Sequence, residues 1–214
     1  MNLPYDSLRG SILCNQSLDV FAATASEVGD SDSPWARFAA ANRLATKDPT
    51  EAVRQLRQIL STPDVETRVW LQAWHCLRAM GESPEAAESR QVHGMVVEVG
   101  MDEGVDALAA YNDRSARYFN YSGAAVIWDV KTDEMSAHIE PFLEVARVIG
   151  AATEPWLGPH PALPTAGDIL IQILTPGGIH IGMGPMNSMQ RDPMGAAVIQ
   201  AAVGLMQALI EVGR

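Results

Sequence analysis

The stretch "DILIQILTPGGIHIGMGP", residues 168–185, carries the clearest structural signal in the chain. Isoleucine recurs at every second position of 169–173, and apolar residues alternate with His180 and Gly182 further on. Such alternation places one set of side chains on each face of a β-strand. Between the two halves, Pro176 presets one corner of a turn and the following glycines accept positive φ. The stretch therefore predicts a β-hairpin.

This glycine-rich hairpin could also be read as a phosphate-binding loop. A phosphate loop leads directly into a helix N-terminus, whereas the next helix start, Asp192-Pro193, lies well downstream. We expect Gly182 and Gly184 to mark a bulge or a close backbone approach instead. His180 is then the one histidine of the hairpin, on the face opposite the apolar residues 179, 181 and 183.

Three segments upstream predict further strands of an antiparallel meander. Residues 92–101, "VHGMVVEVGM", are rich in β-branched residues, and 105–112, "VDALAAYN", follow a turn signal at 102–104. Residues 116–130, "ARYFNYSGAAVIWDV", predict either one long bent strand or two strands divided at Ser122-Gly123.

Two longer helices accompany these strands. Residues 132–150 begin with Thr132 and Asp133 as capping residues, and Pro141 either kinks this helix or starts a second segment. The last helix starts at Asp192-Pro193, and residues 193–210 carry no charge. That length approaches a bilayer span, but Gln200 and Gln207 interrupt the run. We expect a buried helix, with a subunit-interface helix as the stronger rival and a membrane span as the weaker.

Residues 33–90 repeat one device for starting helices. A residue with a side-chain oxygen precedes a proline, which suits the N-cap and the first helical position. The four pairs are Ser33-Pro34, Asp48-Pro49, Thr62-Pro63 and Ser83-Pro84. The pattern predicts a run of short helices. Residues 71–89 resemble the helix–turn–helix of tetratricopeptide repeats over one repeat only, and a solenoid needs about three.

The sequence thus predicts an α+β protein. An antiparallel sheet of about five strands is covered by two helices, around 133–150 and 193–212, and an N-terminal all-helical subdomain packs against it. We divide the chain into an N-terminal extension (1–32), a helical subdomain (33–90) and a sheet domain (91–214). The order of elements is similar to that of profilin-like and roadblock-like sheets, which implies a binding module and no particular ligand.

Composition argues against several classes of partner. The formal net charge is −11, and binders of nucleic acid need clustered Lys and Arg. We therefore expect neither a nucleic-acid nor a membrane partner. The cysteines Cys14 and Cys76 form no CxxC motif, and no leader pattern precedes them. These features predict a cytoplasmic, reduced protein.

Catalytic signals are missing from the sequence. It contains no Walker loop, no GxSxG and no HExxH motif, and "GMGPMN" departs from GxGxxG at the third glycine. No histidine lies three or four residues from another, so no helix face offers two ligands to a metal. We expect no cofactor and no metal, and His75 beside Cys76 is interpreted as a buried structural pair.

The first functional hypothesis is a non-catalytic cytoplasmic interaction or adaptor module. Its partner is another protein or a second copy, bound through an edge strand or the last helix. Tyrosine and arginine are common at binding hot spots, and they are interleaved in "NDRSARYFNYSG". The candidate interaction residues are Arg114, Arg117, Tyr118, Asn120 and Tyr121.

The alternative is a small-molecule-binding protein or a hydrolase-type enzyme. Its pocket lies between the 169–185 hairpin and the proline-rich loop 153–167. If that loop folds over the hairpin, His160 and His180 meet, with Asp168 beside them. These three residues are the candidate ligand-binding residues.

Overall fold

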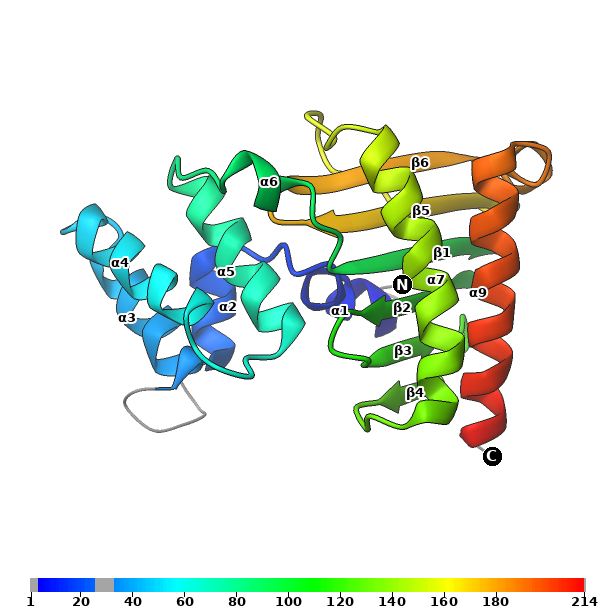
Figure 1. Cartoon of the computed structure of the whole chain (residues 1–214), viewed down its shortest axis with the longest axis horizontal. Coiled ribbons are helices and arrows are strands. Elements are labelled where there is room, and N and C mark those ends of the chain that lie inside the picture. Colours follow the sequence, from blue (N-terminus) through cyan, green and yellow to red (C-terminus); the bar gives the residue numbers. More distant parts are fainter. Residues whose placement is uncertain (1–3, 26–32, 214) are drawn as a thin grey trace.

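The computed structural model describes residues 4–25 and 33–213, and it confirms the α+β class (Figure 1). In this described part the chain forms nine helices and one six-stranded antiparallel sheet with strand order β4-β3-β2-β1-β5-β6. The strands are β1 (Gly94–Met101), β2 (Gly104–Tyr111), β3 (Ala116–Phe119), β4 (Ala125–Trp128), β5 (Asp168–Thr175) and β6 (Gly178–Pro185).

The sheet has one strand more than expected because residues 116–130 form two strands. Asn120 Oδ1 accepts hydrogen bonds from the backbone N–H groups of Ser122 and Ala124, at 3.1 and 2.9 Å. This side chain closes a tight turn, and Gly123 takes a φ of 90° within it. Asn and Gly favour such turns for these reasons. The division at Ser122-Gly123, one of two predicted alternatives, is confirmed.

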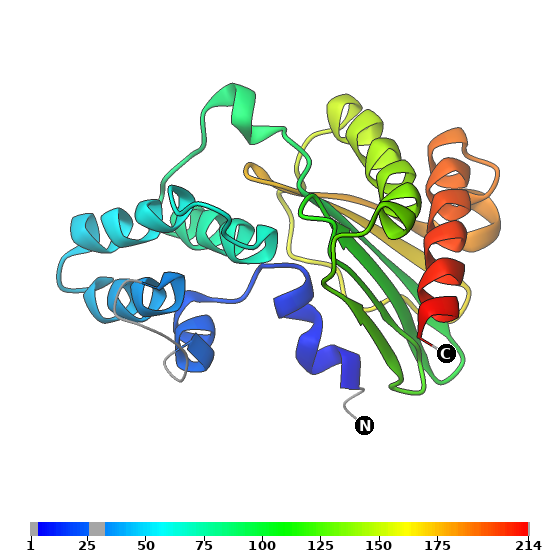
Figure 2. The ribbon, with the colours of Figure 1, turned by 60° about the horizontal axis from the view of Figure 1, so that its bottom comes forward.

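Two long helices cover one face of the sheet, and Figure 2 shows them on the side away from α1. They are α7 (Asp133–Ala152) and α9 (Pro193–Val212), with the short α8 (Met186–Met189) before α9. Every second strand residue packs against these helices in an apolar core. This core includes Met95, Val97, Leu108, Ile171, Ile173, Phe142, Val198 and Leu205. Pro141 lies exposed inside α7 and does not divide it.

The opposite face of the sheet receives the N-terminal segment. Helices α1 (Pro4–Ile12) and α2 (Leu18–Ala25) occupy a region for which no element was expected, while residues 1–3 and 26–32 lie outside the described residues. Tyr5 and Ile12 pack against Val96 and Tyr111, and the Tyr111 hydroxyl donates to the Ile12 carbonyl at 2.6 Å. Burial of these apolar side chains holds α1 on the sheet.

A separate apolar cluster lies beside the sheet and joins α2, through Phe21, to the next three helices. These are α3 (Pro34–Leu44), α4 (Pro49–Leu60) and α5 (Thr67–Ala79), and the short α6 (Ala86–Ser89) lies outside the cluster. Ser33 and Asp48 cap α3 and α4 as predicted. The starts predicted at Thr62-Pro63 and Ser83-Pro84 are wrong. The Thr62 hydroxyl instead donates to the Gln58 carbonyl at the end of α4, and Asp64 has a φ of 54°, which a helix excludes.

Candidate functional site

The glycines of the hairpin do not have the role predicted for them. Strands β5 and β6 pair in one continuous register from Thr175↔Gly178 to Asp168↔Pro185, so no bulge interrupts β6. A Cβ added at Gly182 would lie 3.9 Å from Met189 Cε and 4.0 Å from Ile171 Cβ, which is ordinary contact. Neither a bulge nor a close approach explains Gly182. Gly182 is instead one of the residues that line a space between the hairpin and the two long helices.

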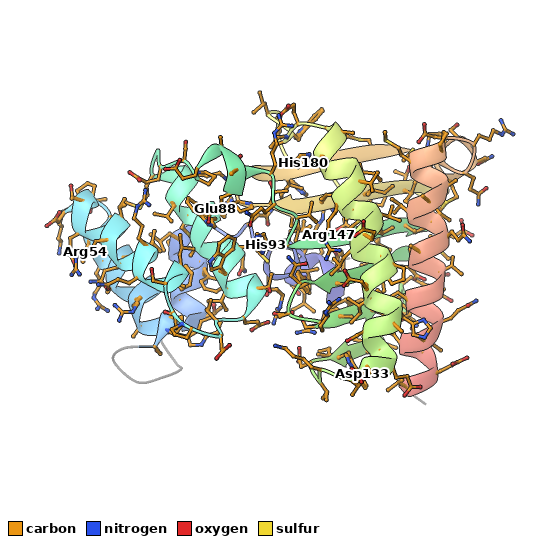
Figure 3. The ribbon with its side chains drawn as sticks, viewed as in Figure 1. Arg54, Glu88, His93, Asp133, Arg147 and His180 are labelled. Atoms are coloured by element: carbon orange, nitrogen blue, oxygen red, sulfur yellow. The ribbon has the colours of Figure 1, made fainter. Side chains whose placement is uncertain are left out.

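His180 lies beside this space. It pairs with Ile173, so its side chain is on the helix-covered face of the sheet. Figure 3 labels it beside the C-terminal end of α7. Only 2% of the residue is exposed. An imidazole this deeply buried needs partners for both of its ring nitrogens.

One ring nitrogen has a partner at the end of α7. His180 Nδ1 lies 2.8 Å from Thr153 Oγ1. The same hydroxyl donates its hydrogen to the Ile149 carbonyl at 2.9 Å. A threonine hydroxyl has a single hydrogen, so Nδ1 must carry the proton in the contact with Thr153. The other nitrogen, Nε2, is then an acceptor with a lone pair.

The second ring nitrogen of His180 has no hydrogen-bond partner in the described part of the chain. This atom, Nε2, is buried. His180 lines a cavity of about 160 Å³ between the hairpin, the end of α7 and the start of α9. The lining is mainly apolar and includes Ile149, Ile171, Ile173, Ile181, Gly182, Met189, Met194 and Gly195, together with Thr153 and Asp192.

The charge at the rim of this cavity is negative. Asp192 is exposed at the start of α9, where its Oδ1 accepts from the backbone N–H groups of Met194 and Gly195 at 3.0 and 2.9 Å. The first donors of the helix are therefore already bonded to a carboxylate. A helix N-terminus in this state offers little to an anion.

Burial also determines the charge of the imidazole. Desolvation lowers the pKa of His180 below its usual value, the nearby Glu154 acts in the opposite direction, and Arg90 acts in the same direction as burial. The ring is therefore neutral at pH 7, with Nε2 unprotonated. A neutral, oriented imidazole can accept a hydrogen bond or a proton at that one atom.

The other two predicted ligand-binding residues lie elsewhere. His160 Nε2 lies 2.7 Å from Gln172 Oε1, and Gln172 is adjacent to Ile173 on β5, so it faces the opposite side of the sheet from His180. Asp168 Oδ2 accepts from the Thr165 hydroxyl at 2.7 Å. Asp168 lines a different groove of about 480 Å³, between residues 161–165 and the hairpin. The structure does not bring the three residues together.

A buried ion pair on the far face escaped sequence reasoning. Glu98 is fully buried in β1 and accepts from the Tyr5 hydroxyl at 2.7 Å and from Arg9 Nε and Nη2, each at 2.8 Å. Arg9 Nη1 also donates to the Pro161 carbonyl at 2.9 Å. The sequence signal that could have indicated this ion pair was Glu98 itself, a charged residue inside the β-branched run of 92–101. These contacts fasten α1 and the proline-rich loop to the sheet.

The candidate interaction residues do not form one surface. Arg117 is 3% exposed, with Nη2 2.5 Å from Asp129 Oδ1. The Tyr118 hydroxyl donates to Asp106, Arg114 pairs with Glu140, and the Asn120 side chain closes the β3–β4 turn. Tyr121 is 44% exposed. Glu66, the residue before α5, lies with Oε1 3.9 Å from Arg117 Nη2.

Nucleophiles and metal ligands give no second site. Both cysteines are buried and unpaired. Burial raises the pKa of the Cys76 thiol to about 11 and that of Cys14 further, so neither is a thiolate at neutral pH. Across residues 4–25 and 33–213, no three His, Cys, Asp or Glu side chains gather as they would around a metal ion.

Comparisons with known proteins add no function. No family model matches the chain, and no similar curated protein or solved structure is found. A functional proposal therefore depends on the geometry of the described residues alone.

Proposed function

We propose that the protein binds a small, mostly apolar molecule in the cavity beside His180. The observation that carries this proposal is the buried Nε2 of His180, which has no partner in the described part of the chain and belongs to a residue that lines a cavity. Nearly all buried polar atoms in proteins are hydrogen-bonded. Leaving one unpaired costs about 1–3 kcal/mol, and a ligand that bonds Nε2 recovers that energy.

The composition of the cavity supports binding. Ligand pockets are commonly lined by apolar side chains with a few placed polar groups. Here isoleucines from β5, β6 and α7 form the apolar part, and His180 is the polar group with a free site. Thr153 holds the ring in place, so Nε2 is oriented before any ligand arrives. Such preorganisation lowers the entropic cost of binding.

The same lining favours binding over hydrolysis. The titratable side chains that line the cavity are His180 and Asp192. One oxygen of Asp192 already caps α9. The Thr153 hydroxyl donates to the Ile149 carbonyl, so its proton is not shared with a base as an activated nucleophile requires. A single oriented acceptor suits recognition.

The proposal is tested with methyl-labelled protein and a set of small apolar fragments. Binding in the cavity moves the methyl signals of Ile149, Ile171 and Ile173, which line it. In Gly182→Val, the added side chain occupies the space and should abolish these shifts. Val148→Ala, an exposed position on α7, is the matched control and should leave them intact. If no fragment moves these methyl signals, the proposed function is overturned.

A second candidate is self-association through the outer side of α9. Residues 193–210 carry no charge, whereas the whole chain has a net charge of −11. Only 33% of the apolar stretch of α9 is buried, and Met194 and Val203 are 46% and 43% exposed. Two acidic copies would repel each other least where both surfaces are uncharged. A second copy of this chain is therefore the partner that this surface suits.

Alone among the described helices, α9 is also long and apolar enough to cross a membrane, with a mean hydropathy of 1.6. Core helices of soluble proteins pass the same test, and Val198, Leu205 and Leu209 of α9 are fully buried against the sheet. Sedimentation of wild type and Val203→Glu tests self-association, with Val148→Glu on α7 as an equally charged control. A dimer lost only in Val203→Glu supports it, and a wild-type monomer at high concentration overturns it.

A further inference from the structure

We infer that the ligand of the His180 cavity is a neutral, phenol-sized molecule that donates one O–H or N–H hydrogen bond to Nε2 of His180. This inference rests on the proposed function and adds the chemical class of the ligand. It draws on three independent observations, which concern the direction of the hydrogen bond, the charge of the surroundings and the size of the space.

The direction of the hydrogen bond follows from the chain of contacts at the end of α7. The Ile149 carbonyl accepts from the Thr153 hydroxyl, and that oxygen accepts from Nδ1 of His180. The proton of the neutral ring is thus held on Nδ1, and Nε2 presents a lone pair. A ligand with only acceptor atoms, such as a ketone or an ether, gains nothing at this atom. A hydroxyl or N–H group supplies the missing donor.

The charge of the surroundings excludes ions. An anionic ligand would meet the carboxylate of Asp192 at the rim and would find the N–H groups of Met194 and Gly195 already bonded. A cation would meet the Asp192 carboxylate only at the exposed rim, and inside it would leave water for a lining made mainly of isoleucine, methionine and glycine. Burying an unpaired charge costs far more than one hydrogen bond returns. The ligand is therefore neutral.

The size of the space limits the ligand to about one ring. The cavity measures about 160 Å³, and an apolar cavity of roughly 150 Å³ in another protein takes up benzene. Gly182 presents the bare backbone of β6 as one wall, and Met189, whose Cε lies 3.9 Å from the Cβ position of Gly182, is the neighbouring wall. Thioethers pack favourably against ring edges. A single ring with one donor group fits both walls.

Phenol and toluene form the decisive pair of probes, because they match in size and differ in the donor. We expect phenol to bind the wild type at least about tenfold more tightly than toluene, measured by titration of the isoleucine methyl signals. In His180→Leu this preference should fall to about onefold while toluene still binds. Benzoate, of similar size but anionic, should bind more weakly than phenol to both forms.

A measurement on the wild type alone guards against misfolding of the variant. Ring ¹⁵N spectra of histidine should show the Nδ1-protonated form of His180, and phenol but not toluene should move the Nε2 signal. If toluene binds as tightly as phenol, the inferred class is overturned and the proposed function stands. If phenol is still preferred in His180→Leu, the class is also overturned. If neither probe binds, the inferred class is overturned, and the proposed function fails with it only when the whole fragment set also leaves the methyl signals unmoved.

Discussion

The Thr153 hydroxyl lies 2.8 Å from Nδ1 of His180, joining the residue that ends α7 to the third residue of β6. The same oxygen bonds the Ile149 carbonyl one turn earlier in the helix. The contact therefore connects two layers of the fold through one side chain. It determines the orientation of the imidazole, its protonated nitrogen, and hence the atom presented to the cavity.

The variant Thr153→Val should free the His180 ring from its hydrogen bond while it preserves the shape of the side chain at position 153. Nδ1 loses its acceptor in a buried position, so we expect the free energy of unfolding to fall by about 1–3 kcal/mol. Ring ¹⁵N spectra should then show a mixture of the two neutral forms of His180. Urea unfolding measures the first effect. Thr165→Val, whose hydroxyl bonds the partly exposed Asp168, is the control. Unchanged stability and ring spectra in Thr153→Val would contradict the assigned role.

The ion pair between Arg9 and Glu98 should be worth far more than the exposed pairs. In Arg9→Met, Glu98 remains fully buried and loses two charge-assisted bonds. We expect a loss of about 3–5 kcal/mol in urea unfolding, with faster hydrogen exchange in α1. Arg54→Met breaks an exposed pair with Glu51 and should lower the free energy of unfolding far less, because solvent screens exposed ion pairs. Equal losses of unfolding free energy in the two variants would show that the Arg9–Glu98 ion pair does not hold α1 on the sheet.

Local patterns predicted the elements of this fold better than they predicted its site. Capping of α9 by Asp192 and the alternation in β5 and β6 depend on neighbouring residues, so they can be read directly. The alternation placed His180 opposite residues 179, 181 and 183, but nothing local said that helices cover the face of the histidine. His160 lies in an aperiodic loop, and nothing local says which face of the sheet that loop crosses. Thr153 meets His180 only because α7 packs across the strands.

Acid should destabilise the protein through two partly buried histidines. Burial lowers the pKa of His75 and of His93 from 6.5 to about 4, with Arg78 adding to the shift of His75. Between about pH 4 and pH 6.5, the two histidines therefore bind more protons in the unfolded chain than in the folded one. Stability is therefore complete above about pH 6.5 and is lost as the pH falls toward 4, at most about 1.4 kcal/mol per pH unit for each histidine.

The variant His93→Gln isolates one of these contributions. The His93 ring stacks on Trp70 with 4.5 Å between ring centroids, and its replacement should flatten the dependence of the urea midpoint on pH between 6.5 and 4.5. If the urea midpoint of His93→Gln depends on pH as steeply as that of the wild type, the His93 ring takes up its proton equally well in the folded and unfolded states.

Alanine at two glycines should separate folding from binding. In Gly100→Ala the new Cβ overlaps the Thr165 carbonyl oxygen, a backbone atom that cannot swing away, so we expect a loss of about 1–3 kcal/mol or more in urea unfolding. In Gly182→Ala the nearest atoms lie at 3.9 and 4.0 Å, and stability should change by less than about 0.5 kcal/mol or rise slightly. The same methyl group narrows the His180 cavity, so phenol binding should weaken although the fold is intact. A Gly182→Ala protein that is stable and binds phenol as the wild type does would place the ligand elsewhere.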